Sequence, residues 1–204
     1  MTVPRLEPHE SSSFRESSKE ALLLVLHPLV RWLSVMRVRP DTLTVIGWTL
    51  ALVAAVLFGL GYARIAGAVM LLGGIFDALD GAVARESNRM SSFGAFLDST
   101  LDRLSESAVF VGLVFFYAGA DRPFGALLAG VAMTFSLLTS YARARAEGLN
   151  IDCEVGLLER AGRIVILSVL SIAGLPTLGL GLLAAGALIT TAQRILHVRR
   201  ATRG

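Results

Sequence analysis

The chain has 204 residues, of which 54% are hydrophobic and only 17% charged, and its formal net charge is +3. Soluble domains contain about 25% charged residues, so this composition excludes an ordinary soluble protein and indicates a polytopic membrane protein. The single cysteine, Cys153, excludes an internal disulfide. Nothing in the composition indicates a nucleic acid partner.

The amino-terminal part of the chain differs from the rest. Residues 1–17 are polar and serine-rich, without the apolar stretch of a signal peptide, and predict a flexible cytoplasmic tail. Residues 18–38 are apolar on one side, are interrupted by Pro28 and carry several Arg residues and Trp32. This pattern is typical of an amphipathic helix that lies in the membrane interface. Residues 18–204 as a whole are expected to form one transmembrane domain.

Six apolar segments follow, and each predicts a transmembrane helix because about 20 apolar residues cross a ~30 Å hydrocarbon core. They cover residues 42–62, 65–84, 93–118, 124–142, 163–175 and 177–196, and the fifth is short. The expected fold class is therefore all-α integral membrane, with six transmembrane helices preceded by the interfacial helix.

Basic residues sort sharply between the two sides of this predicted topology. Six spans put both termini on one side, where 17 of the 19 Lys and Arg residues then fall, and only Arg64 and Arg122 lie opposite. The positive-inside rule makes the terminal side cytoplasmic. We expect a multi-pass protein of the cell membrane whose two termini face the cytoplasm.

Four aspartates lie at the edges of two of the predicted spans. Asp77 and Asp80 are on the second span, and Asp98 and Asp102 are on the third, all within 26 residues. At ~100° per residue, the members of each pair are about 60° and 40° apart around the helix axis, so each pair converges on one point. Because a short loop joins the two spans, they are expected to be antiparallel neighbours. The four carboxylates therefore predict a metal site that opens to the cytoplasm.

The donor set indicates which metal and which ligand would bind. Oxygen ligands without His or Cys favour Mg²⁺ or Mn²⁺, and such ions bind together with phosphates. Gly81 and Gly94 leave room for a bulky group, and Arg85 supplies a guanidinium suited to phosphate oxygens. Two metal ions beside a diphosphate favour displacement at phosphorus. The alternative is a set of buried ion pairs, such as Asp98–Arg103 or Asp80–Arg85.

The spacing of these residues resembles the signature of the CDP-alcohol phosphatidyltransferase family. The motif has eight fixed residues, Asp77-x2-Asp80-Gly81-x2-Ala84-Arg85-x8-Gly94-x3-Asp98-x3-Asp102, and the resemblance extends across the whole chain. The resemblance implies a CDP-linked lipid as substrate, a homodimer, and metal ligation by the four aspartates. It also implies that Asp102 is the general base and that the contacts to the CDP-lipid are Asp41, Thr42, Thr44, Gly81, Arg85 and Ser91. Asp41 and Ser91 are equally good helix caps, so both interpretations stay open for them.

A second group of basic residues bears on the acceptor. The pattern Ser140-Tyr141-x-Arg143-Ala-Arg145-Ala-Glu147, followed by Glu159-Arg160 and a late Gln193-Arg194, resembles the phosphatidylinositol phosphate synthase branch of the family. The branch departs from this chain at Ala161-Gly162, where a proline and an acid are typical. The resemblance implies inositol 1-phosphate as acceptor, with its phosphate bound by Arg143, Arg145, Arg194, Arg160 and Arg163.

Other functions stay open at this point. Glycerol 3-phosphate also offers a phosphate and a hydroxyl, so phosphatidylglycerophosphate synthesis is an alternative. Membrane anchoring alone would place arginines at these helix ends. A prenyltransferase would share the paired acids, and a membrane cation transporter would use acids as an ion pathway. The Asp80-Gly81-x2-Ala84-Arg85 element and the presence of only six spans argue against the prenyltransferase. The transporter is less favoured because the acids crowd onto two helices near one face.

Overall fold

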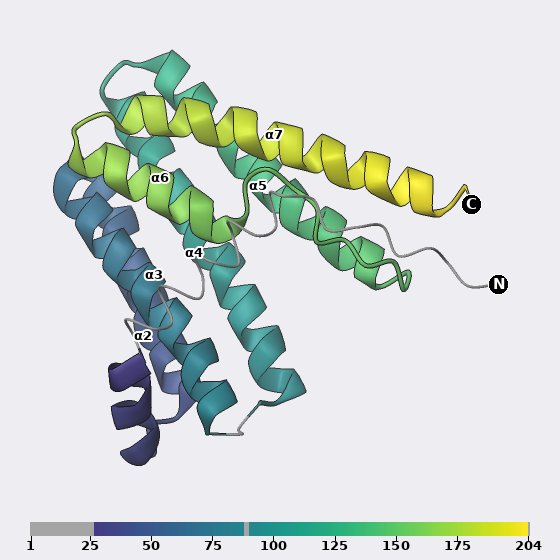
Figure 1. The fold of residues 1–204 in the computed structure, drawn as a ribbon. Coiled ribbons are helices and arrows are strands. Elements are labelled where there is room, and N and C mark those ends of the chain that lie inside the picture. The colour runs from purple at the N-terminus through teal and green to yellow at the C-terminus, as the bar shows by residue number, and fades with distance from the viewer. Residues whose placement is uncertain (1–26, 88–89, 204) are drawn as a thin grey trace.

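The computed structural model describes residues 27–87 and 90–203, and every regular element in these ranges is a helix (Figure 1). A short helix covers residues 27–35. The long helices are α2 (Pro40–Gly59), α3 (Ala63–Glu86), α4 (Ser92–Gly119), α5 (Pro123–Glu147), α6 (Arg160–Ile172) and α7 (Pro176–Ala201). The expected all-helical class is confirmed. The predicted tail, residues 1–17, and the beginning of the predicted interfacial helix lie outside the described residues.

Four of these helices are long and apolar enough to cross a membrane, namely α2, α3, α5 and α7. The chain is therefore a multi-pass membrane protein. Helix α4 has 28 residues, but it carries Asp98, Asp102, Arg103 and Glu106. Helix α6 has only 13 residues, which span about 20 Å at 1.5 Å per residue. Helices α4 and α6 thus differ from a simple apolar transmembrane helix, α4 by its charged residues and α6 by its short length.

Two helices end five residues beyond their predicted spans. Helix α5 continues five residues past 142, and α7 continues five past 196. These last turns are polar, and helix propensity does not depend on hydrophobicity. In α5, Arg143 Nε donates to Glu147 Oε1 at 2.7 Å, an i,i+4 pair that supports the final turn.

Helix α2 organises the part of the bundle that carries the aspartates. It packs against both α3 and α4, while α6 packs on α3 and α7, and α5 packs on α4 and α7. Glycines permit the two contacts of α2. A Cβ on Gly47 would lie 3.2 Å from the Gly73 carbonyl oxygen, and one on Gly112 would lie 2.1 Å from the Ala55 carbonyl oxygen. The backbones therefore touch where larger residues would force them apart.

The helices form two arms that diverge from the end where the short turns lie (Figure 1). Helices α2, α3 and the first half of α4 make one arm, and the last halves of α5 and α7 make the other. A core joins the arms near that end, and its largest fully buried apolar residues include Phe58, Phe110, Leu113, Tyr117 and Leu180. Both arms are thus anchored on the same packed region.

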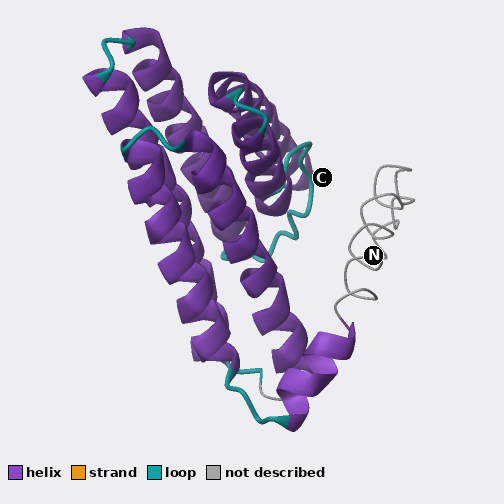
Figure 2. Cartoon of the chain, turned by 90° about the vertical axis from the view of Figure 1, so that its left-hand side faces the viewer, coloured by secondary structure: helices purple, strands orange, loops and turns teal. Residues whose placement is uncertain are grey.

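The helix at 27–35 crosses the foot of the first arm, beside the start of α2 (Figure 2). Val30 is buried in a cluster with Leu79 and Val83 of α3, while Trp32 and Met36 are exposed. One face therefore packs on the bundle and the other is free to meet lipid headgroups. This agrees with the amphipathic character expected for residues 18–38, in the part from residue 27 that the structure describes. The helix ends before Arg37, whose φ of 55° breaks the helical path.

Candidate active site

Three of the four aspartates converge on one point between α3 and α4. Carboxylate oxygens of Asp77, Asp98 and Asp102 all lie within 4.8 Å of one another. Asp80 lies one turn from Asp77 on α3. Its side chain is buried, and its Oδ2 atom has no hydrogen-bond partner among the described atoms. Asp98 Oδ1 is also buried without a partner.

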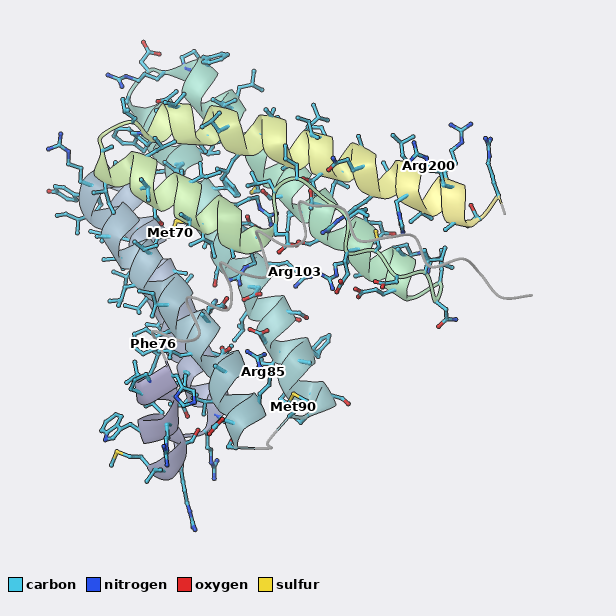
Figure 3. All side chains as sticks on the ribbon, in the orientation of Figure 1. Met70, Phe76, Arg85, Met90, Arg103 and Arg200 are labelled. Atoms are coloured by element: carbon cyan, nitrogen blue, oxygen red, sulfur yellow. The ribbon has the colours of Figure 1, made fainter. Side chains whose placement is uncertain are left out.

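The space for this cluster exists because α3 and α4 do not pack closely on each other. Each packs on α2 instead, and a cavity lies between them near the loop that joins them. Figure 3 shows Arg85 and Met90 at this end. The two carboxylate-bearing helices were expected to be antiparallel neighbours. They do not pack closely on each other, but their carboxylates meet across the space between them.

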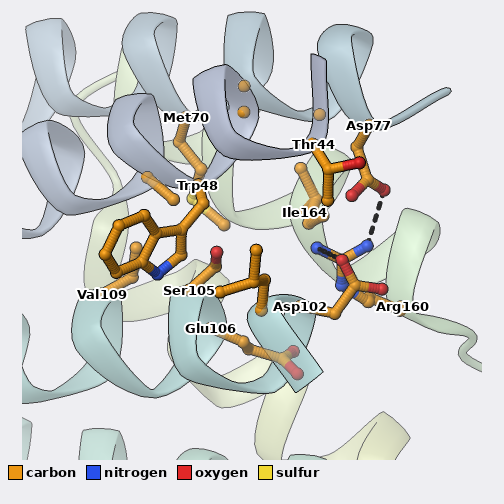
Figure 4. Close-up of a pocket in the computed structure, with 15 residues that line it drawn as sticks. Thr44, Trp48, Met70, Asp77, Asp102, Ser105, Glu106, Val109, Arg160 and Ile164 are labelled. Carbon is orange, nitrogen blue, oxygen red and sulfur yellow. Dashed lines mark hydrogen bonds and ion pairs between the residues drawn. The ribbon is translucent and has the colours of Figure 1, made fainter. Parts of the chain in front are cut away.

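Arg160, the first residue of α6, bridges the two helices (Figure 4). Its Nη1 atom donates to Asp77 Oδ2 at 2.6 Å, and its Nη2 atom lies 2.7 Å from Asp102 Oδ1. One guanidinium thus contacts a carboxylate from each side of the cluster. Charged hydrogen bonds of this kind fix both position and orientation.

The ion pairs considered from the sequence do not form. In the part of the chain that the structure describes, neither Asp98–Arg103 nor Asp80–Arg85 is in ion-pair contact. Arg103 Nη1 donates to the Ser99 carbonyl instead, because that carbonyl lies one turn away on the same helix. The partner of the cluster comes from α6, which is distant in sequence.

The residues present fit a divalent cation. Three carboxylates converge, a fourth is adjacent, and two buried carboxylate oxygens have no partner. Leaving such oxygens unsatisfied is costly, and a hard cation with oxygen ligands would satisfy them. One arginine supplies a single positive charge against four aspartates. The cluster is therefore suited to hold a divalent metal.

A cavity of about 190 Å³ opens beside the cluster. Helix α3 contributes Asp80, Gly81 and Arg85, and α4 contributes Asp98 and its amino-terminal turn. The predicted CDP-lipid contacts that line this cavity are Asp41, Thr44, Gly81, Arg85 and Ser91. Thr42 is exposed and does not line it. Positively polarised starts of α2 and α4 both border the cavity, which favours an anionic occupant.

Local contacts explain why small residues occur around this cavity. A Cβ on Gly81 would lie 3.4 Å from Arg85 Nη1, so the arginine folds over the glycine. Ser91 is the N-cap of α4, and its Oγ accepts from Gly94 N at 2.9 Å. The cap interpretation of Ser91 is therefore confirmed. The cap interpretation of Asp41 is wrong, because α2 begins at Pro40 and places Asp41 within the first turn.

A narrower cavity of about 30 Å³ lies on another side of the cluster (Figure 4). Asp77, Asp102 and Arg160 form its polar wall, and Trp48 and Val109 are among its apolar residues. Its volume is enough for only one or two water molecules. Asp77 and Asp102 thus line the narrower cavity, whereas Asp98 and Asp80 line the larger one.

Glu106 is a site residue that the sequence reasoning missed. Arg163 Nε donates to Glu106 Oε1 at 2.6 Å and Nη2 donates to Oε2 at 2.9 Å, while Nη1 donates to the Leu158 carbonyl at 3.3 Å. Arg163 is 1% exposed. Every nitrogen of this guanidinium is therefore engaged within the protein. The signal for Glu106 was its position four residues after Asp102, which continues the spacing from Asp98.

The other predicted acceptor residues surround the loop between α5 and α6, residues 148–159. Arg194 is 4% exposed and joins the loop to α5. Its Nε donates to the Val155 carbonyl at 2.9 Å and its Nη1 to the Thr139 carbonyl at 2.5 Å. Arg143 is partly exposed and lies 3.6 Å from Glu154 of the same loop. Arg145 is exposed. The structure therefore brings Arg143 and Arg194 to one loop, at whose end Arg160 meets the aspartates.

One face of α7 holds this loop in place. Thr190 Oγ1 accepts from Leu158 N at 2.9 Å, and Gln193 Oε1 accepts from Leu157 N at 2.8 Å. His197 Nε2 lies 2.9 Å from the Asp152 carbonyl oxygen. With Arg194, these side chains have the i, i+3, i+4, i+7 spacing of one helix face. They satisfy loop backbone groups that would otherwise lack partners.

Comparison with known proteins gives a consistent result. The family model described as CDP-alcohol phosphatidyltransferase matches residues 37–195. The chain is 35% identical, over 87% of its length and 93% of the relative's, to a phosphatidylinositol phosphate synthase of Cutibacterium acnes. It is 44% identical, over 66% of its length and 66% of the relative's, to an archaetidylinositol phosphate synthase of Methanothermobacter thermautotrophicus.

Solved structures of a phosphatidylinositol phosphate synthase from Mycobacterium tuberculosis have the same fold. The crystal structure with CDP-DAG bound is 33% identical, has a TM-score of 0.75, and covers 84% of this chain and 92% of that chain. A second crystal structure, in complex with manganese and citrate, also has a TM-score of 0.75 at 33% identity and covers 84% of this chain and 87% of that chain.

Proposed function

This chain belongs to the CDP-alcohol phosphatidyltransferase family, and we propose that it transfers the phosphatidyl group of CDP-diacylglycerol to a hydroxyl of inositol 1-phosphate, releasing CMP. One observation carries the proposal. Asp98, whose carboxylate converges with those of Asp77 and Asp102, lines a cavity whose walls also include Asp80, Gly81 and Arg85. Relatives that are inositol phosphate lipid synthases support the acceptor.

Asp102 is the proposed general base. Its carboxylate would accept the proton of the acceptor hydroxyl, and that oxygen would attack the lipid-side phosphorus as the bond to the CMP phosphate breaks. Its position in the cluster, next to Arg160, supports this role. We propose that Asp77, Asp80, Asp98 and Asp102 together hold two Mg²⁺ or Mn²⁺ ions. When bound, these ions would supply positive charge against the diphosphate.

The CDP part of the lipid is proposed to occupy the larger cavity. Arg85 would contact a phosphate, and Gly81 would let the ligand approach the helix backbone. Asp41, Thr44 and Ser91 line the same space, which supports contacts to the nucleotide. Thr42 remains a predicted contact that the cavity does not include.

The acceptor phosphate is proposed to bind where Arg143 and Arg194 meet the loop between α5 and α6. Both guanidinium groups lie next to this loop, and Arg160 at its end contacts the aspartates. This arrangement supports an acceptor whose phosphate is held by arginines while its hydroxyl points to the cluster. Arg145 is a weaker candidate because it is exposed, and Arg163 because Glu106 occupies it.

We further propose that α4 and α6 also cross the membrane, which gives six spans with the aspartates and both termini on the cytoplasmic side. The distribution of Arg and Lys supports this topology. We also propose a homodimer in the plasma membrane. Gly112 and Gly125 lie at close helix contacts within the protomer, where a Cβ would clash with Ala55 and Tyr117. A Cβ on Gly130 would have no atom of the described residues within 4 Å. The face around Gly130 is therefore open to a second copy.

The test compares acceptors side by side. Purified protein with Mg²⁺ and CDP-diacylglycerol is expected to release CMP fastest with inositol 1-phosphate, and slowly with glycerol 3-phosphate, serine or free inositol. Preference for glycerol 3-phosphate would instead favour phosphatidylglycerophosphate synthesis. A parallel arm with the CDP-activated ether lipid tests the archaetidyl alternative, which one of the relatives represents.

Substitutions separate the two substrate sites. Arg143→Ala is expected to raise the KM for inositol 1-phosphate by about tenfold, with little change for the CDP-lipid, because one charged contact to a phosphate is lost. Arg199→Ala serves as the matched control, since Arg199 lies at the exposed end of α7. Equal losses for both substrates would contradict the proposed acceptor site.

A further inference from the structure

A concavity of about 550 Å³ lies at the end of the bundle opposite the aspartates. Three short turns converge there, at residues 60–62, 120–122 and 173–175, and all three contribute to its lining. Helices α3, α5 and α7 begin directly after these turns. The positive ends of three helix dipoles therefore lie around one hollow.

Two arginines line this hollow, Arg64 from the first turn of α3 and Arg122 from the residue before α5. Neither side chain makes a hydrogen bond or ion pair with another residue that the structure describes. The Arg64 guanidinium lies against Gly174, where a Cβ would be 3.4 Å from its Nη2 atom. Asp121 is next in sequence to Arg122, but it does not line the hollow. Two exposed guanidinium groups that have no ion-pair partner among the described residues thus line one hollow.

The rest of the lining is apolar and aromatic. Tyr62, Ile65 and Phe116 contribute to it, and Tyr62 and Ile65 are both exposed. Below them, the Tyr117 and Thr177 hydroxyls are 2.7 Å apart and satisfy each other. Aromatic residues and arginines at the ends of membrane helices lie at the level of lipid headgroups. Guanidinium groups at that level suit phosphate oxygens, and the apolar rim suits the first carbons of acyl chains.

We propose that this hollow binds the phosphate of an anionic membrane phospholipid from the leaflet opposite the aspartate cluster. The phosphate lies between Arg64 and Arg122, and the acyl chains extend along the side chains of Tyr62 and Ile65 into the membrane. The bound lipid contacts the turn between α2 and α3 and the turns before α5 and α7, and so links these three turns. The site is separate from the proposed active site, which lies toward the other end of α3.

The test uses phosphatidylglycerol as the probe, with the protein purified in detergent and examined by native mass spectrometry. Arg64→Gln with Arg122→Gln is expected to lower the fraction of protein that retains one phosphatidylglycerol by about tenfold or more, because two charged contacts are lost. Arg199→Gln with Arg200→Gln is the matched control at the other end of the molecule. The control is expected to retain the lipid as the unsubstituted protein does.

Two further measurements make the outcome decisive. The Arg64→Gln, Arg122→Gln protein is expected to release CMP at the unsubstituted rate, which shows that it folds. Inorganic phosphate at the same concentration is expected not to displace the lipid. Unchanged lipid retention in this variant would overturn the site, and displacement by inorganic phosphate would overturn its assignment to a lipid. Absence of CMP release in the unsubstituted protein would contradict only the proposed function.

Discussion

The buried pair of Glu106 and Arg163 provides a quantitative test of how the site is held together. Glu106→Gln keeps the size of the side chain but leaves the Arg163 charge without a carboxylate in a position that is 1% exposed. Removing one partner of a buried ion pair costs roughly 3–5 kcal/mol. We expect the lower end, about 3 kcal/mol, because the amide oxygen can still accept one hydrogen bond. The ratio of folded to unfolded protein should fall by about a hundredfold.

The thiol of Cys153 can be used to measure this loss of stability. Cys153 is the only cysteine and is fully buried in the loop between α5 and α6. Burial raises the pKa of the Cys153 thiol above its ordinary value, which lowers the thiolate fraction at neutral pH. A thiol-reactive dye should therefore label the folded protein slowly and the opened protein quickly. The rate of labelling during a detergent or thermal titration reports the loss of structure.

A double-mutant cycle isolates the pair itself. Arg163→Met alone should also destabilise the protein, because it leaves Glu106 as an unpaired buried charge. The double variant should be more stable than the sum of the two single losses predicts. Losses below about 1 kcal/mol that simply add would refute the reasoning, since they would mean that the pair carries no coupling energy.

Three further predictions concern packing, metal and the loop. Gly112→Ala should lower the melting temperature, at a cost of about 1–3 kcal/mol, because its Cβ would lie 2.1 Å from the Ala55 carbonyl oxygen. Gly130→Ala should not, because its Cβ would meet no atom of the described residues within 4 Å. Chelation with EDTA should abolish CMP release, and Mg²⁺ or Mn²⁺ should restore it; activity that survives chelation would contradict the metal site. Thr190→Val with Gln193→Leu should raise the KM for inositol 1-phosphate more than that for the CDP-lipid, because it frees the loop beside the acceptor arginines; unchanged kinetics would exclude a positioning role for these two side chains.

The sequence was sufficient to predict the all-helical class, because long apolar runs in a membrane chain form helices. It was also sufficient to predict that Asp77, Asp98 and Asp102 converge, since helical spacing and a short connection bring them together. Helix ends were predicted less well. Polar turns such as the one ending at Glu147 continue a helix beyond the apolar segment, and hydropathy does not detect them.

Partners between distant helices could not be predicted from spacing. Arg160 follows Asp77 by 83 positions, and its contact with the cluster depends on how α6 crosses α3. The resemblance to the family branch drew attention to Gln193 and Arg194, but their bonds to the loop required the structure. Local patterns thus identified the residues, whereas tertiary packing determined the contacts of these residues.

The most direct test of the central claim is to identify the lipid product. Purified protein with Mg²⁺, CDP-diacylglycerol and inositol 1-phosphate is expected to yield phosphatidylinositol phosphate and CMP in equal amounts by mass spectrometry. Asp102→Asn should form neither, because the amide cannot accept the hydroxyl proton. Phosphatidic acid as the lipid product, or an Asp102→Asn protein as active as the unsubstituted one, would contradict the account.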